Sequence, residues 1–368
     1  MAEPFINGAY AEFPELDRMS IVDPANGEEV GSVPACGAAG VDRAVRSAYE
    51  AFPAWRDTPA AKRGAILGEA AHAVLGAVGE LAPLLTSEQG KPLREARLEI
   101  RRFVHTLEHY AGLAKSIRGG YVPDLDVDTY GLIVRRPLGV IGAIVPWNFP
   151  TTLLGNKLGP AFITGNVVVA KPADTTPLVT LRIAELMQEA GLPAGVLNVV
   201  TGLGKEVGEP LVGHPDVRRV AFTGSTAVGR RVMEIAAPQF KRVSTELGGS
   251  DPVIVCPDAD VENAVKGINV GRFFNAGQAC LAAKRVYVFE EVYDQFMESL
   301  IKRVSRYEVG NGMEKAEKPK IRMGPLNAAR HRDGLQEQLD DAVKGGASVA
   351  YQGETNGGGG YFFAPAIL

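Results

Sequence analysis

The sequence has few cysteines and no long run of apolar residues. Its three cysteines, Cys36, Cys256 and Cys280, are an odd number in 368 residues, which is untypical of a disulfide framework. The longest uncharged apolar stretches, such as residues 138–147, are too short to span a bilayer. The first residues lack the charged and apolar regions of a signal peptide. We therefore expect a cytoplasmic protein with free thiols and no membrane partner.

An excess of charge of one sign is also missing. The net charge is −4, from 39 basic and 43 acidic residues, and the basic residues are scattered along the chain. Proteins that bind nucleic acid or a membrane surface usually show a basic patch or run. We therefore expect neither partner. Apolar residues make up 46% of the chain, which is ordinary for a globular protein that can bury sizeable cores.

Apolar spacing in the first third of the chain predicts helices. Residues 41–55, 59–90 and 91–117 have apolar side chains at helical intervals. Thr58 suits a helix start and Gly90 a helix stop, so residues 59–90 are predicted to form one helix. The charged residues of the third stretch are expected mostly to form a solvated face.

The middle and last parts have the pattern of an α/β protein. Short β-branched runs alternate with helical patterns such as residues 177–191, which predicts a parallel sheet with crossover helices. A turn-rich segment, residues 118–137, is expected to form a two-stranded excursion before the sheet. A second α/β unit starts after Glu246. The predicted strands are residues 139–145, 166–170, 196–200 and 217–222 in the first unit, and 251–256 and 284–290 in the second.

The C-terminal residues 361–368 form an apolar, strand-like run without a polar tail. An apolar terminal strand needs partners. We therefore expect that the chain is cut inside its second domain, which the mass of the natural gene product would test.

The segment FFNAGQACLAAKR (273–285) contains a candidate nucleophile, Cys280. Cys280 follows a glycine-containing turn and lies between a helical and a strand pattern. A thiolate is a strong nucleophile, but a free thiol has a pKa of about 8.5 and needs nearby amides to lower it. The alternative interpretation is a buried, inert cysteine.

Two further segments contain candidate catalytic side chains. Glu246 ends a short strand before a Gly-Gly turn, where a carboxylate can point into a cleft and act as general base. Asn148 stands in VPWNFP, where two prolines restrict the backbone, and its amide can stabilise an oxyanion. The alternatives are a surface glutamate beside a turn, and a structural turn with Trp147 in the core.

Glycine turns after successive strands indicate a dinucleotide site. In residues 221–232 a strand, a Gly-Ser turn and a helix start follow one another, and free amides there favour a phosphate. Residues 201–208 contain a second turn, which departs from the usual G-x-G-x-x-G pattern. Lys171 can bond ribose hydroxyls or a 2′-phosphate, and the nearby Asp174 would repel that phosphate, which favours NAD. The alternatives are ordinary turns, a solvated lysine and a helix-capping aspartate.

Together these segments resemble the aldehyde dehydrogenase superfamily, because five motifs occur in the family's order. Weaker similarity upstream and downstream extends the resemblance over nearly the whole chain. The five motifs are PWNFP (146–150), KPADTTP (171–177), FTGSTAVG (222–229), ELGG (246–249) and GQAC (277–280).

The resemblance implies a role for each matching position. Cys280 would be the nucleophile, Glu246 the general base, and Asn148 with the Cys280 amide the oxyanion hole. The substrate would be a small aldehyde and the cofactor NAD, or else NADP, and no metal is expected. The residues expected to contact the cofactor are Val145, Pro146, Trp147, Lys171, Asp174, Gly204, Phe222, Thr223, Gly224, Ser225, Val228, Leu247 and Gly248.

The resemblance also implies an α/β fold with three parts. Residues 1–117 and 138–246 would form a Rossmann-like cofactor domain, and residues 247–368 a second, incomplete α/β catalytic domain. Residues 118–137 would be a β-hairpin used in oligomerisation, with a homodimer or homotetramer expected once the missing C-terminal part is supplied. Family members are longer than this chain. They usually have Glu at the position of Asp174, and this difference leaves the choice between NAD and NADP open.

Three other functions are compatible with these residues. A CoA-acylating dehydrogenase would pass the acyl group to CoA, although Glu246 favours water as the acceptor. A cysteine hydrolase would need a histidine partner, and the five histidines lie outside the glycine-turn segments. A shortened relative could retain cofactor binding without catalysis. The surroundings of Cys280 resemble semialdehyde dehydrogenases, but the sequence shows no convincing cationic site for a substrate carboxylate.

Overall fold

The computed structural model describes residues 2–314, 320–355 and 358–368, and its centre is a seven-stranded sheet. Five strands run parallel, and β1 and β2 extend the sheet in antiparallel pairing beside β9. The strand order is β11 (Arg242–Glu246), β10 (Val217–Thr223), β7 (Val140–Ile144), β8 (Val167–Lys171), β9 (Leu197–Val199), β1 (Phe5–Ile6) and β2 (Ala9–Tyr10).

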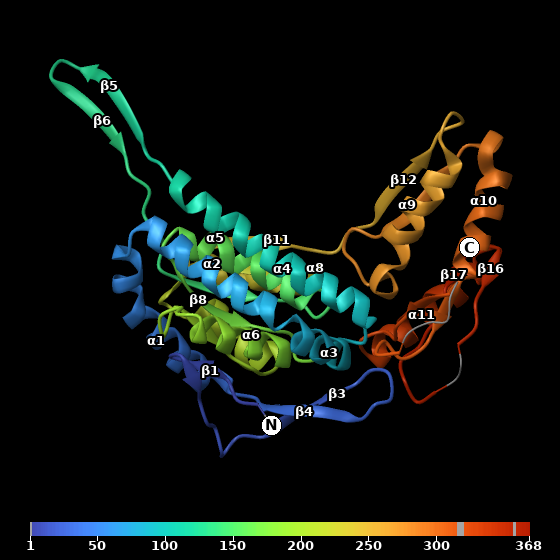
Figure 1. Ribbon diagram of the computed structural model, residues 1–368, viewed down its shortest axis with the longest axis horizontal. Helices are drawn as coiled ribbons and strands as arrows, with labels where there is room; N and C mark the ends of the chain where they lie inside the picture. Colours follow the sequence, from blue (N-terminus) through green and yellow to red (C-terminus); the bar gives the residue numbers. More distant parts are fainter. Residues whose placement is uncertain (1, 315–319, 356–357) are drawn as a thin grey trace.

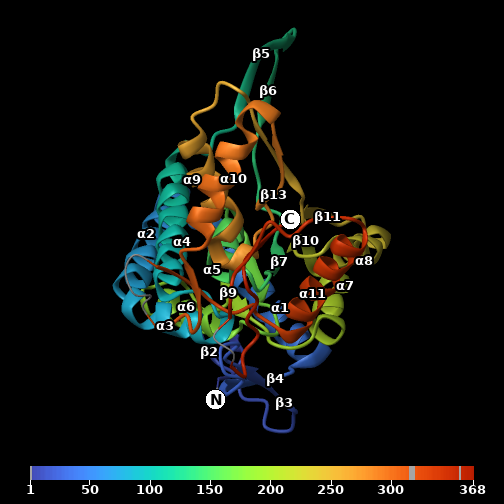
Figure 2. The same ribbon diagram turned by 90° about the vertical axis from the view of Figure 1, so that its right-hand side faces the viewer.

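The four strands predicted in the middle of the chain are confirmed, and so is their parallel arrangement. Their β-branched side chains are buried because helices cover both faces of the sheet. Figure 2 shows the two helical layers with the sheet between them. One layer contains α2 (Ala60–Gly76), α4 (Leu93–Leu113), α5 (Pro150–Ile163) and α6 (Leu178–Glu189); the other contains α1 (Gly37–Asp57), α7 (Glu209–Gly213) and α8 (Thr226–Ala236).

The prediction of one helix over residues 59–90 is wrong. The stretch forms α2 and α3 (Val78–Gln89), bent by 72° at Ala77. Gly76 and Gly79 flank the bend, and glycine is a poor helix former. The helix start is also displaced, since α2 begins at Ala60, whereas the stop at Gly90 is confirmed by its left-handed φ of 99°. No single described helix is long and apolar enough to cross a membrane; the bent pair α2–α3 meets that test by length and composition only.

The N-terminal strands were missed by the sequence analysis. In addition to β1 and β2, β3 (Arg18–Val22) pairs with β4 (Glu29–Pro34) in a separate antiparallel ribbon. These strands are short or only partly apolar, so their pattern is weak. The excursion predicted at residues 118–137 is confirmed as a hairpin of β5 (Gly120–Asp126) and β6 (Thr129–Ile133), which extends away from the body (Figure 1).

The second α/β unit contains β12 (Asp251–Val255) parallel to β13 (Ala283–Val288), connected through α9 (Val261–Phe273). Its buried apolar side chains form a cluster separate from the main core, which is drawn from residues 5–236. The proposed domain boundaries stay a prediction. Of the expected terminal strand, Ala366–Ile367 forms β17. The remaining elements are α10 (Glu290–Val304), β14 (Tyr307–Val309), β15 (Ile321–Met323), α11 (Ala329–Lys344) and β16 (Tyr351–Gln352), the partner of β17.

Candidate active site

The loop after β7 places Asn148 beside the loop that contains Cys280. Pro150 starts α5 at its first position, where proline is well tolerated. The Asn148 side-chain amide donates to the backbone oxygen of Gln278 at 3.1 Å. Its own oxygen accepts from the Phe149 amide at 3.0 Å. The side chain is therefore fixed from both ends, and its partner Gln278 precedes Cys280 by two residues.

Cys280 follows a turn with an unusual backbone. Asn275 and Ala276 each have φ of 53°, and Gly277 has φ of 76°. Left-handed conformations cost free energy in residues with a Cβ, so other contacts must hold this turn. Beyond it, Cys280 is a free, exposed thiol. The alternative of a buried cysteine is therefore wrong, and the reactivity of Cys280 stays a prediction.

Three buried charged residues, one just before α4 and two within its first turns, hold both loops. Lys91 donates to the Asn148 backbone oxygen at 2.8 Å and forms an ion pair with Glu99. Glu99 also accepts from the Thr151 amide at 2.9 Å, at the start of α5. Glu95 accepts from the Asn275 amide at 2.8 Å. Burial raises the pKa of Glu95 to about 7, and this hydrogen bond opposes the rise.

The expectation that the charges of residues 91–117 mostly form a solvated face is confirmed, and these three residues are the exceptions. Lys91, Glu95 and Glu99 are each at most 5% exposed. Glu95 and Glu99 are four residues apart and lie on one side of α4, which is the signal that the sequence offered. Their partners lie far away along the chain, so the signal alone could not identify them.

Glu246 ends β11 opposite Thr223 of β10, and its side chain is exposed. The turn that follows it approaches the nucleophile loop, because a Cβ added at Gly249 would lie 3.2 Å from the Cys280 backbone oxygen. No hydrogen bond within the described chain joins the Cys280 thiol to Glu246 or to the Asn148 amide. The structure thus brings the three segments together without a direct bond among the three side chains.

Lys157 is a functional candidate that the sequence analysis missed. It lies in α5, and its ammonium donates to the Thr223 hydroxyl at 2.6 Å. Burial lowers the pKa of Lys157 to about 8, and the negative charge of Glu246 opposes that effect. A lysine within an otherwise apolar helix was the available signal.

The start of α8 fits a phosphate group. Ser225 is the N-cap, and its hydroxyl accepts from the Val228 amide at 3.4 Å. The first turn has no acidic residue, and Ser225 and Val228 are exposed, so the positive helix end is open to an anion. A Cβ at Gly224 would lie 2.5 Å from the Phe222 ring, so this turn requires glycine. These residues suit the pyrophosphate of a dinucleotide.

The other expected cofactor residues surround the same strand ends. Lys171 is 5% exposed and donates to the Pro172 oxygen at 3.0 Å, so the alternative of a solvated lysine is wrong. Burial lowers the pKa of Lys171, and Asp174 opposes this. Trp147 is half-buried and stacks on His331 of α11 at 4.5 Å between ring centroids, a neighbour that sequence reasoning missed. Val145 is buried, Pro146, Asp174, Thr223 and Leu247 are half-buried, and Gly204 and Gly248 are exposed.

The model of the aldehyde dehydrogenase family matches residues 11–368. The chain belongs to this family. A succinate-semialdehyde dehydrogenase (NADP⁺) of Escherichia coli K12 is 41% identical over 366 residues, which cover 100% of this chain and 75% of that protein. A glutarate-semialdehyde dehydrogenase of Pseudomonas putida is also 41% identical, with the same coverage of 100% and 75%.

Solved structures agree with this aldehyde dehydrogenase over nearly its whole length. A putative aldehyde dehydrogenase from Burkholderia cenocepacia has a TM-score of 0.95 at 36% identity, covering 99% of this chain and 76% of that chain. An NAD⁺ complex of an aldehyde dehydrogenase from Bacillus cereus has a TM-score of 0.95 at 35% identity, covering 99% and 74%. The expected family and α/β fold class are confirmed. The enzyme oxidises an aldehyde to an acid with NAD(P) as hydride acceptor.

Proposed function

We propose that Cys280, Glu246 and Asn148 perform this oxidation in the roles that the sequence motifs suggest. The main support is the hydrogen bond of 3.1 Å from the Asn148 amide to Gln278, which fixes the amide beside the nucleophile loop. The Cys280 thiolate attacks the aldehyde carbon and forms a covalent adduct. The bound nicotinamide supplies the acceptor for the hydride, and a thioester remains on Cys280.

Asn148 stabilises the negative oxygen of the adduct together with the Cys280 backbone amide. A side-chain amide has two N–H donors, and one of them is used by Gln278. The second N–H is available to the substrate oxygen while the first keeps the side chain oriented. This arrangement supports an oxyanion role better than that of a purely structural turn.

Glu246 activates the water that hydrolyses the thioester. Its carboxylate is exposed at the end of β11, on the turn that approaches Cys280. The Lys157 ammonium lies close enough for its charge to interact with that of the carboxylate, and an exposed carboxylate can accept the proton of a water molecule as a general base. Transfer of the acyl group to water needs such a base, whereas transfer to the thiol of CoA depends less on a base. We therefore favour hydrolysis over CoA acylation.

The cofactor is held at the carboxyl ends of the strands. The start of α8 binds the pyrophosphate, and Lys171 and Asp174 lie at the adenosine ribose. We propose NAD as the preferred form because Asp174 would repel a 2′-phosphate, although the Escherichia coli relative is named for NADP⁺. Comparing the two cofactors at equal concentration tests this preference.

The relatives also suggest the substrate and the assembly. Two of them are named for succinate and glutarate semialdehyde, and we propose a semialdehyde substrate here. We further propose a homodimer or homotetramer formed through the β5–β6 hairpin. The free cysteines support a cytoplasmic location.

Replacing the proposed nucleophile tests this function. We expect Cys280→Ala to abolish NADH formation from a panel of aldehydes while cofactor binding, measured by NADH fluorescence, stays unchanged. Cys256→Ala is the matched control, because Cys256 is also exposed. Equal activity of Cys280→Ala and the parent chain would refute the proposal.

A further inference from the structure

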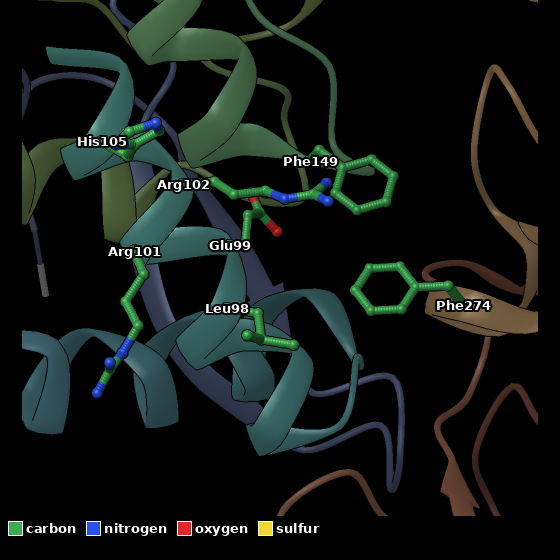
Figure 3. A pocket seen from close by; sticks show the side chains of 7 residues that line it. All are labelled: Leu98, Glu99, Arg101, Arg102, His105, Phe149 and Phe274. Atoms are coloured by element: carbon green, nitrogen blue, oxygen red, sulfur yellow. The ribbon is translucent and has the colours of Figure 1, made fainter. Parts of the chain in front are cut away.

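A cavity of about 310 Å³ lies beside the proposed active site, between helix α4 and two aromatic rings. Phe149 follows Asn148 directly, and Phe274 opens the turn that leads to Cys280. The two rings are nearly parallel, with 5° between their planes and 6.1 Å between their centroids. The cavity therefore adjoins both loops of the proposed site, although Cys280 is not among its lining residues. These are Leu98, Glu99, Arg101, Arg102, His105, Phe149 and Phe274 (Figure 3).

The wall of the cavity formed by α4 contains two arginines. Arg101 and Arg102 are exposed along it, and the exposed His105 follows them. Glu99 is the acid among the lining residues, but its carboxylate is 1% exposed and already paired with Lys91. The negative charge of Glu99 is thus compensated by Lys91, so it does not offset the positive charge that Arg102 brings to the cavity.

Arg102 differs from its neighbour Arg101 in direction. Figure 3 shows the Arg102 guanidinium pointing toward the Phe149 ring, whereas Arg101 points away from both rings. Throughout the described parts of the chain, no carboxylate pairs with Arg102 and no side chain accepts a hydrogen bond from it. A guanidinium presents a planar set of donors that matches a carboxylate in two parallel hydrogen bonds. Arg102 thus has this donor set free, next to an apolar surface.

We propose that Arg102 binds the terminal carboxylate of the substrate, so that the enzyme prefers short aldehydes with an anionic end. The apolar part of the substrate would lie along Phe149 and Phe274, with its carbonyl toward Cys280. The cavity volume is at the lower end of the range for ligand pockets, which suits a small molecule. The proposal rests on the proposed function, because it concerns the substrate of the same site.

The test uses the reversible addition of Cys280 to an aldehyde, which needs no cofactor. The sulfur bonds to the carbonyl carbon, and the carbonyl π electrons move to the oxygen. The thiol loses its proton, and the oxygen takes up one proton. The adduct slows alkylation of Cys280 by iodoacetamide, which mass spectrometry of the digested chain measures residue by residue. Cys256 is exposed outside the cavity lining and serves as the internal reference.

The probes are 4-oxobutanoate and butanal, two four-carbon aldehydes with and without a carboxylate. We expect 4-oxobutanoate to halve the alkylation rate of Cys280 at a concentration about tenfold lower than butanal, as a charge-assisted hydrogen bond implies. Arg102→Gln should raise the halving concentration of 4-oxobutanoate about tenfold and leave that of butanal unchanged. Arg97→Gln, which removes the same charge from an exposed position of α4 outside the cavity lining, should change neither.

Two results would overturn the role of Arg102. One is equal protection by the two aldehydes in the parent chain. The other is an Arg102→Gln variant that leaves the preference for 4-oxobutanoate intact or shifts both aldehydes equally. If neither aldehyde protects Cys280 in the parent chain, the thiol is out of reach of the carbonyl, and the proposed function fails together with this inference.

Discussion

Some residues of the site can be recognised in the sequence, and others cannot. Cys280, Glu246 and Asn148 stand out because each follows a turn or strand end within a short motif, and the structure places their segments side by side. Glu95 gives no such sign, since its partner Asn275 is 180 positions away. A buried carboxylate of this kind is recognisable only when the amide it accepts from is known.

Asn148 offers a direct test at this scale. We expect Asn148→Ala to lower kcat by about 10²–10³, because one donor to the developing oxyanion is lost. Steady-state NADH formation measures this. Asn156→Ala is the matched control, since Asn156 is an exposed asparagine of α5, the helix that follows the Asn148 loop. A similar loss in both variants would show that the effect is one of folding, against an oxyanion role for Asn148.

Among the elements, the strands of the sheet were the easiest to predict. Continuous β-branched runs such as residues 166–170 indicate a strand buried on both faces, and β8 is completely buried. The break between α2 and α3 was not predictable from periodicity, since apolar residues continue through it. The short β1 was missed because it depends on pairing with β9, which is distant in sequence.

The junction between α3 and α6 predicts a pH dependence of stability. Glu88 is completely buried and accepts from the Leu178 and Val179 amides at the start of α6. Burial raises the pKa of Glu88 to about 8, from 4.5 in the unfolded chain. The folded state therefore keeps the Glu88 carboxyl group protonated up to a higher pH than the unfolded chain does. The contribution of protonated Glu88 to the stability of the fold is complete below pH 4.5 and is lost as the pH rises to about 8.

Glu88→Gln should remove this contribution. We expect the free energy of unfolding of the variant, measured by urea titration, to depend less on pH than that of the parent chain between pH 4.5 and 8. The difference across this window should be about 2–4 kcal/mol. Glu69→Gln, an exposed acid of α2, should retain the slope of the parent. Parallel curves for Glu88→Gln and the parent would contradict the assignment.

At the scale of the whole molecule, the comparisons add what sequence patterns could not. The chain spans about three quarters of the length of the relatives it matches, so the family could be identified from segments distributed along the chain. For the assembly, the relevant observation is instead that the β5–β6 hairpin exposes its apolar side chains in the single chain. Tyr121 and Leu132 face each other across β5 and β6 and are 63% and 64% exposed.

These exposed side chains test the proposed oligomer. We expect the double substitution Tyr121→Ser and Leu132→Asp to shift sedimentation velocity toward the monomer, because a partner subunit would bury both residues. The circular dichroism spectrum should not change, since neither residue packs in the core. Glu80→Ser, an exposed change on α3, is the control. An unchanged oligomer would exclude the hairpin as the interface.

The most direct test of the account follows one turnover of Glu246→Gln. The variant retains Cys280 and Asn148 but lacks the carboxylate that activates water. Rapid mixing with NAD and aldehyde should give a burst of NADH close to one equivalent per Cys280, followed by almost no steady-state turnover, with the acyl group found on Cys280 by mass spectrometry. Full steady-state turnover in Glu246→Gln, without an acylated Cys280, would contradict the proposed division of roles.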